Sequence, residues 1–543
     1  MEASDIFFIF YCVNPKNVRT FTPRNFPSKI YYMAKRKKDT TLGLYDKPKS
    51  EQELRLENVK ELYNFLFEAC NIIRGPVSQD NFKDYITPIL YYKRISDVYE
   101  EERQYALAES GGDEEYASLP EQHRFVIPDD CQWEEVRKRT ENLGAALVGA
   151  MRGIELANPD TLYGVLSMFG SQKWMDKRNL SDAKIRDLIE HLSKKNLGNL
   201  QYPSDLMGDA YEILLKKFAD DSKAQAGEFY TPRPVVQLLV RILDPKPGES
   251  VYDPACGSGG MLIEAVRHMN YSNLCCGSIF GQEKNVINSA IAKMNLFLHG
   301  ASDFNIMQGD TLRSPKILQN GEIAKFDCVI ANPPFSLDKW GAVEWASDKY
   351  GRNIWGTPSD SCGDYAWIQH MIKSMKPGTG RMAVVMPQGI LFRGGEEGRI
   401  REKLVKSDIL EAVVTLGDKL FYGTGLSPCF LILRRMKPAP HSARVLMIDG
   451  TKILTPQRAQ NILSDSDVDR FYELYTNYQD VEDFAKVVTL NDIAGKDYDL
   501  SPNKYVQYHR EAQRPYSEVL SDFKAAYQEV KLRESQFINL LTA

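Results

Sequence analysis

Paired cysteines and long apolar runs are both missing from this chain. None of its nine cysteines forms a C-x-x-C pair, so neither a metal site nor a redox motif is predicted. The odd number of cysteines, several of them in apolar runs, is typical of reduced, buried thiols in a cytoplasm. The N-terminal apolar run, Ile6–Val13, is too short to span a bilayer. It also lacks the flanks of a secretory signal, so no membrane contact and a cytoplasmic location are expected.

An excess of positive charge is absent too. The 543 residues carry a net charge of −5, with 43% hydrophobic and 26% charged residues, a composition typical of a globular protein of several domains. Such a chain does not hold nucleic acid with its whole surface. Any such binding must be local or shared with a more basic partner.

The chain begins with a segment, residues 1–50, to which no function is assigned. It becomes basic around Met33. We expect a flexible basic extension, or a start codon assigned too early with Met33 as the true start.

Residues 51–220 carry a helical pattern of apolar residues without a strand-like run between them. The expected helices span residues 58–73, 85–107 and 133–152, and a cap within 179–182 opens another that runs to about Lys195. An all-helical N-terminal domain over 51–220 is predicted, and its sequence assigns it no chemistry.

The pattern changes to short β-rich runs that alternate with amphipathic helices. The expected strands are 250–252, 278–280, 328–330, 382–386, 412–416, 429–433 and 445–448. The expected helices are 261–269, 286–299, 364–375 and 398–406. This alternation predicts a doubly wound α/β sheet, in a catalytic domain over 221–455. Glycine-rich turns before the last strands favour an antiparallel edge.

Residues 456–543 are expected to return to helix. Apolar residues between Leu520 and Leu541 recur at alternating steps of three and four, which is the spacing of a short coiled-coil face. Such a face can pack on the chain's own body or on a partner, and partner binding is favoured slightly.

A glycine-rich turn, Asp253–Gly260, follows the first expected strand and precedes a helix. It is neither a G-x-G-x-x-G fingerprint nor a Walker loop, so phosphate binding is disfavoured. A turn such as Gly257-Ser258-Gly259 lets a ligand approach the backbone closely. Taken alone it is equally well a structural turn. Glu283 ends the next strand, where an acid commonly binds ribose hydroxyls, and this favours a cofactor site that includes Asp253.

The stretch Asn332-Pro333-Pro334-Phe335 ends the strand at 328–330. Two prolines fix the backbone and remove two N–H donors. The carbonyls and the Asn332 amide are then available as acceptors beside an aromatic face, which suits a planar amine such as that of a nucleobase. A turn that only ends a strand is the alternative.

Two further segments are weaker candidates. Asp310, in Gly309–Leu312, is placed to face the same crevice, although on its own a capping role is the favoured explanation. The segment Glu228-Phe229-Tyr230-Thr231-Pro232-Arg233 enters a helix. Its backbone N–H groups, hydroxyl and guanidinium suit a carboxylate, and Thr231 as a plain N-cap is the alternative.

Together these motifs, in this order, are specific. GEFYTPR at 227–233, DPACGSGG at 253–260, Glu283, GDTL at 309–312 and NPPF at 332–335 resemble the modification (M) subunits of type I restriction–modification systems, which are adenine-N6 DNA methyltransferases. The resemblance covers about residues 51 to 543. It implies a Rossmann-like fold and S-adenosyl-L-methionine (AdoMet) as cofactor. The methionine part would lie near 228–233 and 257–260, the ribose at Glu283 and the adenosine amine near Asp310.

The implied chemistry is direct methyl transfer to a flipped adenine. Asn332 and Pro333 would hold the amine and Phe335 would stack on the base, so no cysteine nucleophile is needed. No sizeable target-recognition region follows residue 335. The resemblance therefore implies double-stranded DNA, a separate specificity (S) subunit and a second M copy as partners, and a restriction (R) subunit can join them.

Alternatives remain open. A protein-glutamine or RNA adenine methyltransferase would use the same fold and the same turn. A non-catalytic scaffold would keep the fold for assembly, although the intact set Asp253, Glu283 and Asn332 disfavours it.

Overall fold

The computed structural model describes residues 51–162, 164–166, 171–178, 180–221, 231–270, 277–301, 303–421, 427–457, 460–509 and 515–542. The extension predicted at residues 1–50 lies outside them. The chain divides into two units, Met1–Leu56 and Glu57–Ala543. Of the first unit, the structure describes only the start of α1. All that follows concerns the second unit.

The first half of the second unit is helical, as predicted. Its helices are α1 (Glu51–Ile73), α2 (Phe82–Ser110), α3 (Glu114–Ala117), α4 (Trp133–Arg137), α5 (Leu143–Ala157), α6 (Pro159–Leu162), α7 (Ser171–Met175), α8 (Asp182–Leu192) and α9 (Ser204–Asp221). Their apolar faces share one core, in which residues such as Leu62, Tyr92 and Leu188 are buried. Ser181 caps α8, because its side chain accepts from the Lys184 N–H.

The single helix expected over 133–152 is wrong. The chain turns between α4 and α5, where Asn142 has a left-handed φ of 54°. The Asp182 carboxylate accepts from the N–H groups of Asn142 and Leu143, at 3.0 and 3.1 Å. A carboxylate from a helix 40 residues away thus caps α5, and no local pattern could signal this contact.

A nine-stranded sheet forms the second half, with strand order β11-β10-β8-β9-β7-β6-β1-β2-β3. The strands are β1 (Val251–Asp253), β2 (Ile279–Glu283), β3 (Phe304–Gln308), β6 (Cys328–Ala331), β7 (Arg381–Pro387), β8 (Leu410–Leu416), β9 (Pro428–Arg434), β10 (Arg444–Gly450) and β11 (Ala485–Thr489), and β4 (Leu318–Gln319) pairs with β5 (Glu322–Ile323) as a separate ribbon. All seven expected strands are present, so the doubly wound α/β fold is confirmed.

Two strands and one position in the sheet differ from the predictions. The edge strands β3 and β11 were missed, because polar residues such as Asn305 and Lys486 interrupt their apolar runs. Since β11 pairs with β10, the expectation of a helical region over 456–543 is wrong for residues 485–489. Inside the sheet, β9 is antiparallel to both of its neighbours, and the antiparallel edge is β11.

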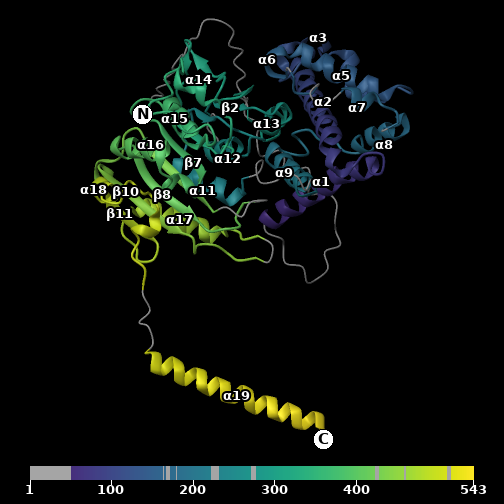
Figure 1. Ribbon diagram of the computed structural model, residues 1–543. Coiled ribbons are helices and arrows are strands. Elements are labelled where there is room, and N and C mark those ends of the chain that lie inside the picture. Colours follow the sequence, from purple (N-terminus) through teal and green to yellow (C-terminus); the bar gives the residue numbers. More distant parts are fainter. Residues whose placement is uncertain are drawn as a thin grey trace, which may run out of the picture. The chain divides into compact units, whose positions relative to one another are not determined.

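Helices cover both faces of the sheet (Figure 1). On one face, α11 (Arg233–Leu243), α12 (Gly260–Asn270) and α17 (Asp465–Asn477) share a core with alternate strand residues. On the other face, α15 (Asp364–Ser374) and α16 (Gly395–Lys406) do the same, and Ile493 of α18 (Leu490–Ala494) joins them. The short α14 (Ala342–Ala346) lies in the long connection between β6 and α15.

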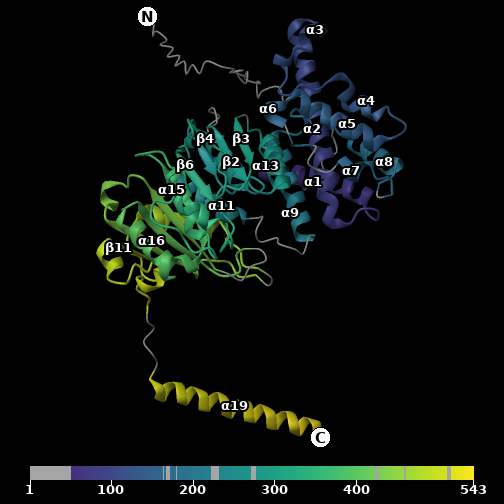
Figure 2. The same cartoon turned by 45° about the horizontal axis from the view of Figure 1, so that its top comes forward.

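Helix α13 (Val286–Leu298) joins the helical part to the sheet (Figure 2). Its residues Ala292 and Leu296 pack in a sheet core, whereas Met294 and Phe297 are buried in the helical core. A helix with apolar residues all round is buried on both sides. The two parts are therefore packed together through α13.

The last helix, α19 (Tyr516–Thr542), carries exposed apolar side chains. Phe523, Tyr527, Val530 and Phe537 are each more than half exposed. Among the helices that the structure describes, none combines the length and the apolar character needed to cross a membrane.

Candidate active site

The candidate site lies where strands β1 and β6 meet. These strands are parallel neighbours, with Val251 opposite Cys328 and Tyr252 opposite Val329. From β1 the chain winds outward through β2 and β3, and then returns to build β6 and β7 on the other side. A crevice forms outside the carboxyl ends of the strands at such a switch point, and ligands of doubly wound proteins bind there.

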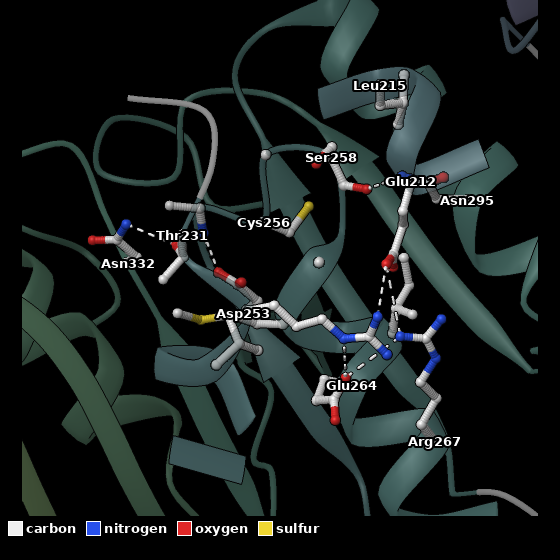
Figure 3. Close-up of a pocket in the computed structure, with 17 residues that line it drawn as sticks. Glu212, Leu215, Thr231, Asp253, Cys256, Ser258, Glu264, Arg267, Asn295 and Asn332 are labelled. Carbon is white, nitrogen blue, oxygen red and sulfur yellow. Dashed lines mark hydrogen bonds and ion pairs between the residues drawn. The ribbon is translucent and has the colours of Figure 1, made fainter. Parts of the chain in front are cut away.

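A pocket opens at this point (Figure 3). Its lining residues come from α9, α11, α12, α13 and the ends of β1 and β6: Glu212, Leu215, Thr231, Arg233, Val236, Asp253, Ala255, Cys256, Gly257, Ser258, Gly260, Met261, Ile263, Glu264, Arg267, Asn295 and Asn332. Six of the predicted site residues line it together, from three separate stretches of the chain: Thr231, Arg233, Asp253, Gly257, Ser258 and Asn332. Three others, Glu228, Phe229 and Tyr230, lie outside the described residues.

The glycine-rich turn is built to leave its backbone open. Gly257 has a left-handed φ of 53°, and nothing lies within 4 Å of the place that a Cβ would take. Its N–H donates to Oε2 of Glu283 at 3.0 Å, which ties the predicted ribose acid to the turn. Gly259 does not line the pocket; a Cβ placed there would lie 3.4 Å from the Cβ of Ala292. A side chain at Gly257 would fill the space that a ligand needs.

Asn295 supports the same turn and was missed from the sequence. It is 2% exposed, and its Nδ2 donates to the Ser258 carbonyl at 2.8 Å. The only available signal is an amide within the largely apolar helix α13, which also holds Asn288, and a buried polar residue with a structural role gives the same pattern.

Asp253 is buried to 2% exposure at the end of β1 and accepts from the Ala255 N–H at 2.9 Å. Burial raises the pKa of this carboxyl to about 8, and repulsion from Glu283 adds to the shift. Burial also raises the pKa of Glu283. Burial makes it costly to ionise these two acids, and a positive charge beside them would lower that cost. A positively charged ligand would therefore be stabilised at this position.

A network of ion pairs forms the far wall of the pocket. Arg233 and Arg267 both lie close to Glu264, at 4.0 and 3.6 Å, and both approach Glu212, at 3.9 and 3.7 Å (Figure 3). Glu212 also lies 3.3 Å from Nε2 of His299. Because Glu212 comes from α9, inside the region predicted as a separate helical domain, nothing in the sequence pointed to it.

Asn332 follows β6 and is oriented by Thr231. Its Nδ2 donates to the Thr231 hydroxyl at 2.9 Å, across 101 residues of sequence. Its Oδ1 is buried and has no hydrogen-bond partner among the residues that the structure describes. A buried acceptor without a donor costs stability, and such groups are often functional. Pro333 is buried, while Phe335 is half-buried and packs against a sheet core.

The remaining predicted residues do not line the pocket. Pro232 is the N-cap of α11. Asp310 accepts from the Arg313 N–H at 3.1 Å and pairs with Lys284 at 2.9 Å, so the capping contact is present. The Gly309 N–H donates to the Glu283 carbonyl at 2.9 Å, which joins the loops after β2 and β3.

Neither cysteine near the site is suited to act as a nucleophile. Burial raises the pKa of Cys256 well above its usual value, and it raises the pKa of Cys328 to about 12. Both thiols are therefore protonated at neutral pH, and a thiol is a far weaker nucleophile than a thiolate.

Comparison with known proteins shows the family of this chain. The N-6 DNA methylase family model matches residues 203–514, and the HsdM N-terminal domain model matches 62–192. The type I restriction enzyme MjaVII methylase subunit of Methanocaldococcus jannaschii is 32% identical, over 86% of this chain and 81% of that protein. The MjaVIII subunit of the same organism is 30% identical, over 87% and 82%.

Among solved structures, the methyltransferase subunit of a type I restriction–modification system from Streptococcus thermophilus is similar, with a TM-score of 0.71 and 26% identity over 83% of this chain and all of that one. The fold is that of an AdoMet-dependent methyltransferase. More closely, this chain belongs to the N-6 DNA methylase family, within the type I restriction enzyme methylase subunits.

Proposed function

We propose that this chain transfers a methyl group from AdoMet to the N6 amine of adenine in DNA, as the modification subunit of a type I restriction–modification complex. The observation that carries the proposal is the buried Oδ1 of Asn332, an acceptor without a donor, in a pocket shared with Asp253 and Gly257. An amine hydrogen of a flipped adenine would supply the missing donor.

The residues present fit AdoMet. Gly257 leaves open the space that a side chain would fill, and two acids of raised pKa, Asp253 and Glu283, suit a ligand of positive charge. We propose that Asp253, Gly257, Ser258, Gly259, Glu283, Asp310 and residues 228–233 hold it. When bound, AdoMet supplies a methyl group on a sulfonium.

The chain's own residues prepare the amine. The Asn332 amide and the Pro333 carbonyl would accept its two hydrogens, which favours a pyramidal nitrogen with an available lone pair. Thr231 holds the Asn332 amide in orientation, and Pro334 keeps the turn rigid. The exposed part of Phe335 would stack on the flipped base. Positioning and preorganised acceptors supply the acceleration.

Sequence recognition is proposed to reside in a separate specificity subunit. The net charge of −5 supports this, because affinity for DNA phosphates can be shared with a more basic partner. The apolar face of α19 is proposed to bind that partner. A second M copy and a restriction subunit complete the proposed complex. The proposed domains are residues 51–220, 221–455 and 456–543, with β11 of the last one completing the sheet.

The test uses the full chain purified with its specificity partner, labelled AdoMet, and DNA from a strain that lacks this system. N6-methyladenine in the digested product is expected. Asn332→Ala should lower the transfer rate by at least about 100-fold, as loss of one preorganised polar contact does in other enzymes, and should leave AdoMet affinity largely unchanged. Asn491→Ala is a control, because Asn491 is exposed in α18, behind the edge strand β11.

Three results would reject the proposal. Label in cytosine, in RNA or in protein glutamine would assign another substrate. AdoMet binding without any transfer would indicate a scaffold. An unfolded Asn332→Ala variant would return the turn to a structural role.

A further inference from the structure

Beyond the pocket, the turn at residues 332–335 is held by a second group of side chains. Ser336, the next residue, has a left-handed φ of 49°, which is strained for a side chain other than glycine. Its N–H donates to Oδ1 of Asp364 at 2.7 Å. The following carbonyl, of Leu337, accepts from the Gly363 N–H at 3.0 Å. The chain leaving the turn is thus fixed at two consecutive residues to the start of α15.

Arg393 completes this group. Asp364 is fully buried, and Nη1 of Arg393 donates to its Oδ2 at 2.9 Å. The same guanidinium lies 3.0 Å from Sγ of Cys362 and 3.5 Å from Glu397, and its Nη2 donates to the Ser336 hydroxyl at 3.3 Å. One planar cation therefore holds Asp364 and Ser336 simultaneously.

Cys362, Asp364 and Glu397 are spaced closely enough to hold a metal ion. The Arg393 guanidinium contacts all three of them, so the positive charge that this cluster requires is already provided by the protein. A buried carboxylate without such a partner would be costly. The cluster therefore pairs with a cation of the chain itself, the Arg393 guanidinium.

The position of Arg393 is also fixed from behind. The Arg401 guanidinium donates to the carbonyls of Arg393 and Ile390, at 2.7 and 3.2 Å, and Tyr365 donates to the Ile390 carbonyl at 2.8 Å. These contacts hold the segment after β7 beside the segment after β6. The strands β6 and β7 are parallel neighbours in the sheet.

We propose that Asp364 and Arg393 are positioning residues for methyl transfer: they fix the exit of the 332–335 turn and so hold Pro333 and Phe335 in place for the adenine. This inference rests on the proposed function of that turn. The two proline rings restrict the turn's own torsions, whereas the Asp364–Arg393 pair holds Ser336 and so restricts the direction in which the chain leaves the turn.

The experiment measures single-turnover transfer and AdoMet affinity in the full complex described above. Arg393→Ala is expected to lower the transfer rate by about 100-fold, the effect of misplacing a reacting group by about 1 Å, and to keep the AdoMet Kd within about twofold. Arg399→Ala is the matched control. Arg399 lies in the following helix, is 72% exposed and pairs with the exposed Glu396. The transfer rate of the Arg399→Ala variant should therefore equal that of the wild type.

Arg393→Lys keeps a cation beside Asp364 and is the decisive variant if Arg393→Ala loses stability. One ammonium cannot span Asp364 and Ser336 as the fork does, so a rate about tenfold below the wild type is expected, again with AdoMet affinity kept. Wild-type rates in both variants, or an equal loss of rate and of AdoMet affinity, would overturn the positioning role. Absence of transfer by the wild-type complex itself would instead reject the proposed function.

Discussion

Asp253 gives the most quantitative prediction. Its carboxyl is 2% exposed and has a pKa of about 8, so most molecules carry it protonated at pH 7. AdoMet bears a sulfonium and an ammonium, and these charges favour the ionised carboxylate. Binding should therefore release a proton, and affinity should increase with pH.

The size of the effect follows from the pKa. If only the ionised form binds AdoMet, the apparent Kd equals the Kd of that form multiplied by 1 + 10^(pKa − pH). For a pKa of about 8, this factor is about 100 at pH 6 and about 4 at pH 7.5. The Kd is thus expected to fall about 25-fold between these values. The range ends at pH 7.5 because the ligand's own amine titrates near about 8.

Calorimetric titration of the full chain with AdoMet at several pH values measures directly how steeply the Kd falls with pH. Asp253→Asn keeps an oxygen for the Ala255 N–H but has no charge to change, so it should bind weakly with a much shallower slope. Glu283, whose pKa burial also raises, contributes what remains. A flat Kd in the wild type, or an equal slope in Asp253→Asn, would refute the reasoning.

The same carboxyl links stability to pH. Its folded pKa of about 8 lies above the usual 3.8, so the folded chain holds a proton that the unfolded chain releases. The stabilisation is complete below about pH 4 and is lost as the pH rises through about 8. In urea unfolding at pH 8, Asp253→Asn should therefore be more stable than the wild type, on the order of a few kcal/mol. At pH 4 the two should differ little.

Two further variants test the orientation of the amide and the partner face. Thr231→Val removes the acceptor for the Asn332 amide and should slow transfer by about tenfold, the value of one hydrogen bond; an unchanged rate would show that Thr231 does not orient it. Phe523→Ser with Tyr527→Ser should abolish co-purification of the specificity chain while leaving the melting temperature unchanged, because both rings are more than half exposed. Glu529→Ser is the control, and retention of the partner in the double variant would place the interface elsewhere.

Predictions from sequence succeeded where the signal is local. The strands at 328–330, 412–416 and 429–433 are short apolar runs bounded by turn residues, and all three are present. They failed where the cause is distant. The break between α4 and α5 depends on Asp182, and β11 is a strand because β10 offers it an edge.

The order of the site's motifs, and the chemistry that their residue types permit, were determined by the sequence alone. A strand followed by a glycine-rich turn, an acid ending the next strand and an Asn-Pro-Pro-Phe turn require only neighbouring residues to be recognised. Each depends on backbone torsions and short-range donors and acceptors, which the local sequence controls.

Only the tertiary structure decided which of these residues meet and in what state. The pairing of β1 with β6 brings Asn332 to Asp253, packing of α9 adds Glu212, and burial moves the pKa of Asp253 to about 8. The contacts of Asp364 and Arg393 with the exit of the turn arise in the same way. Burial and strand order depend on residues far apart along the chain, so no local pattern contains them.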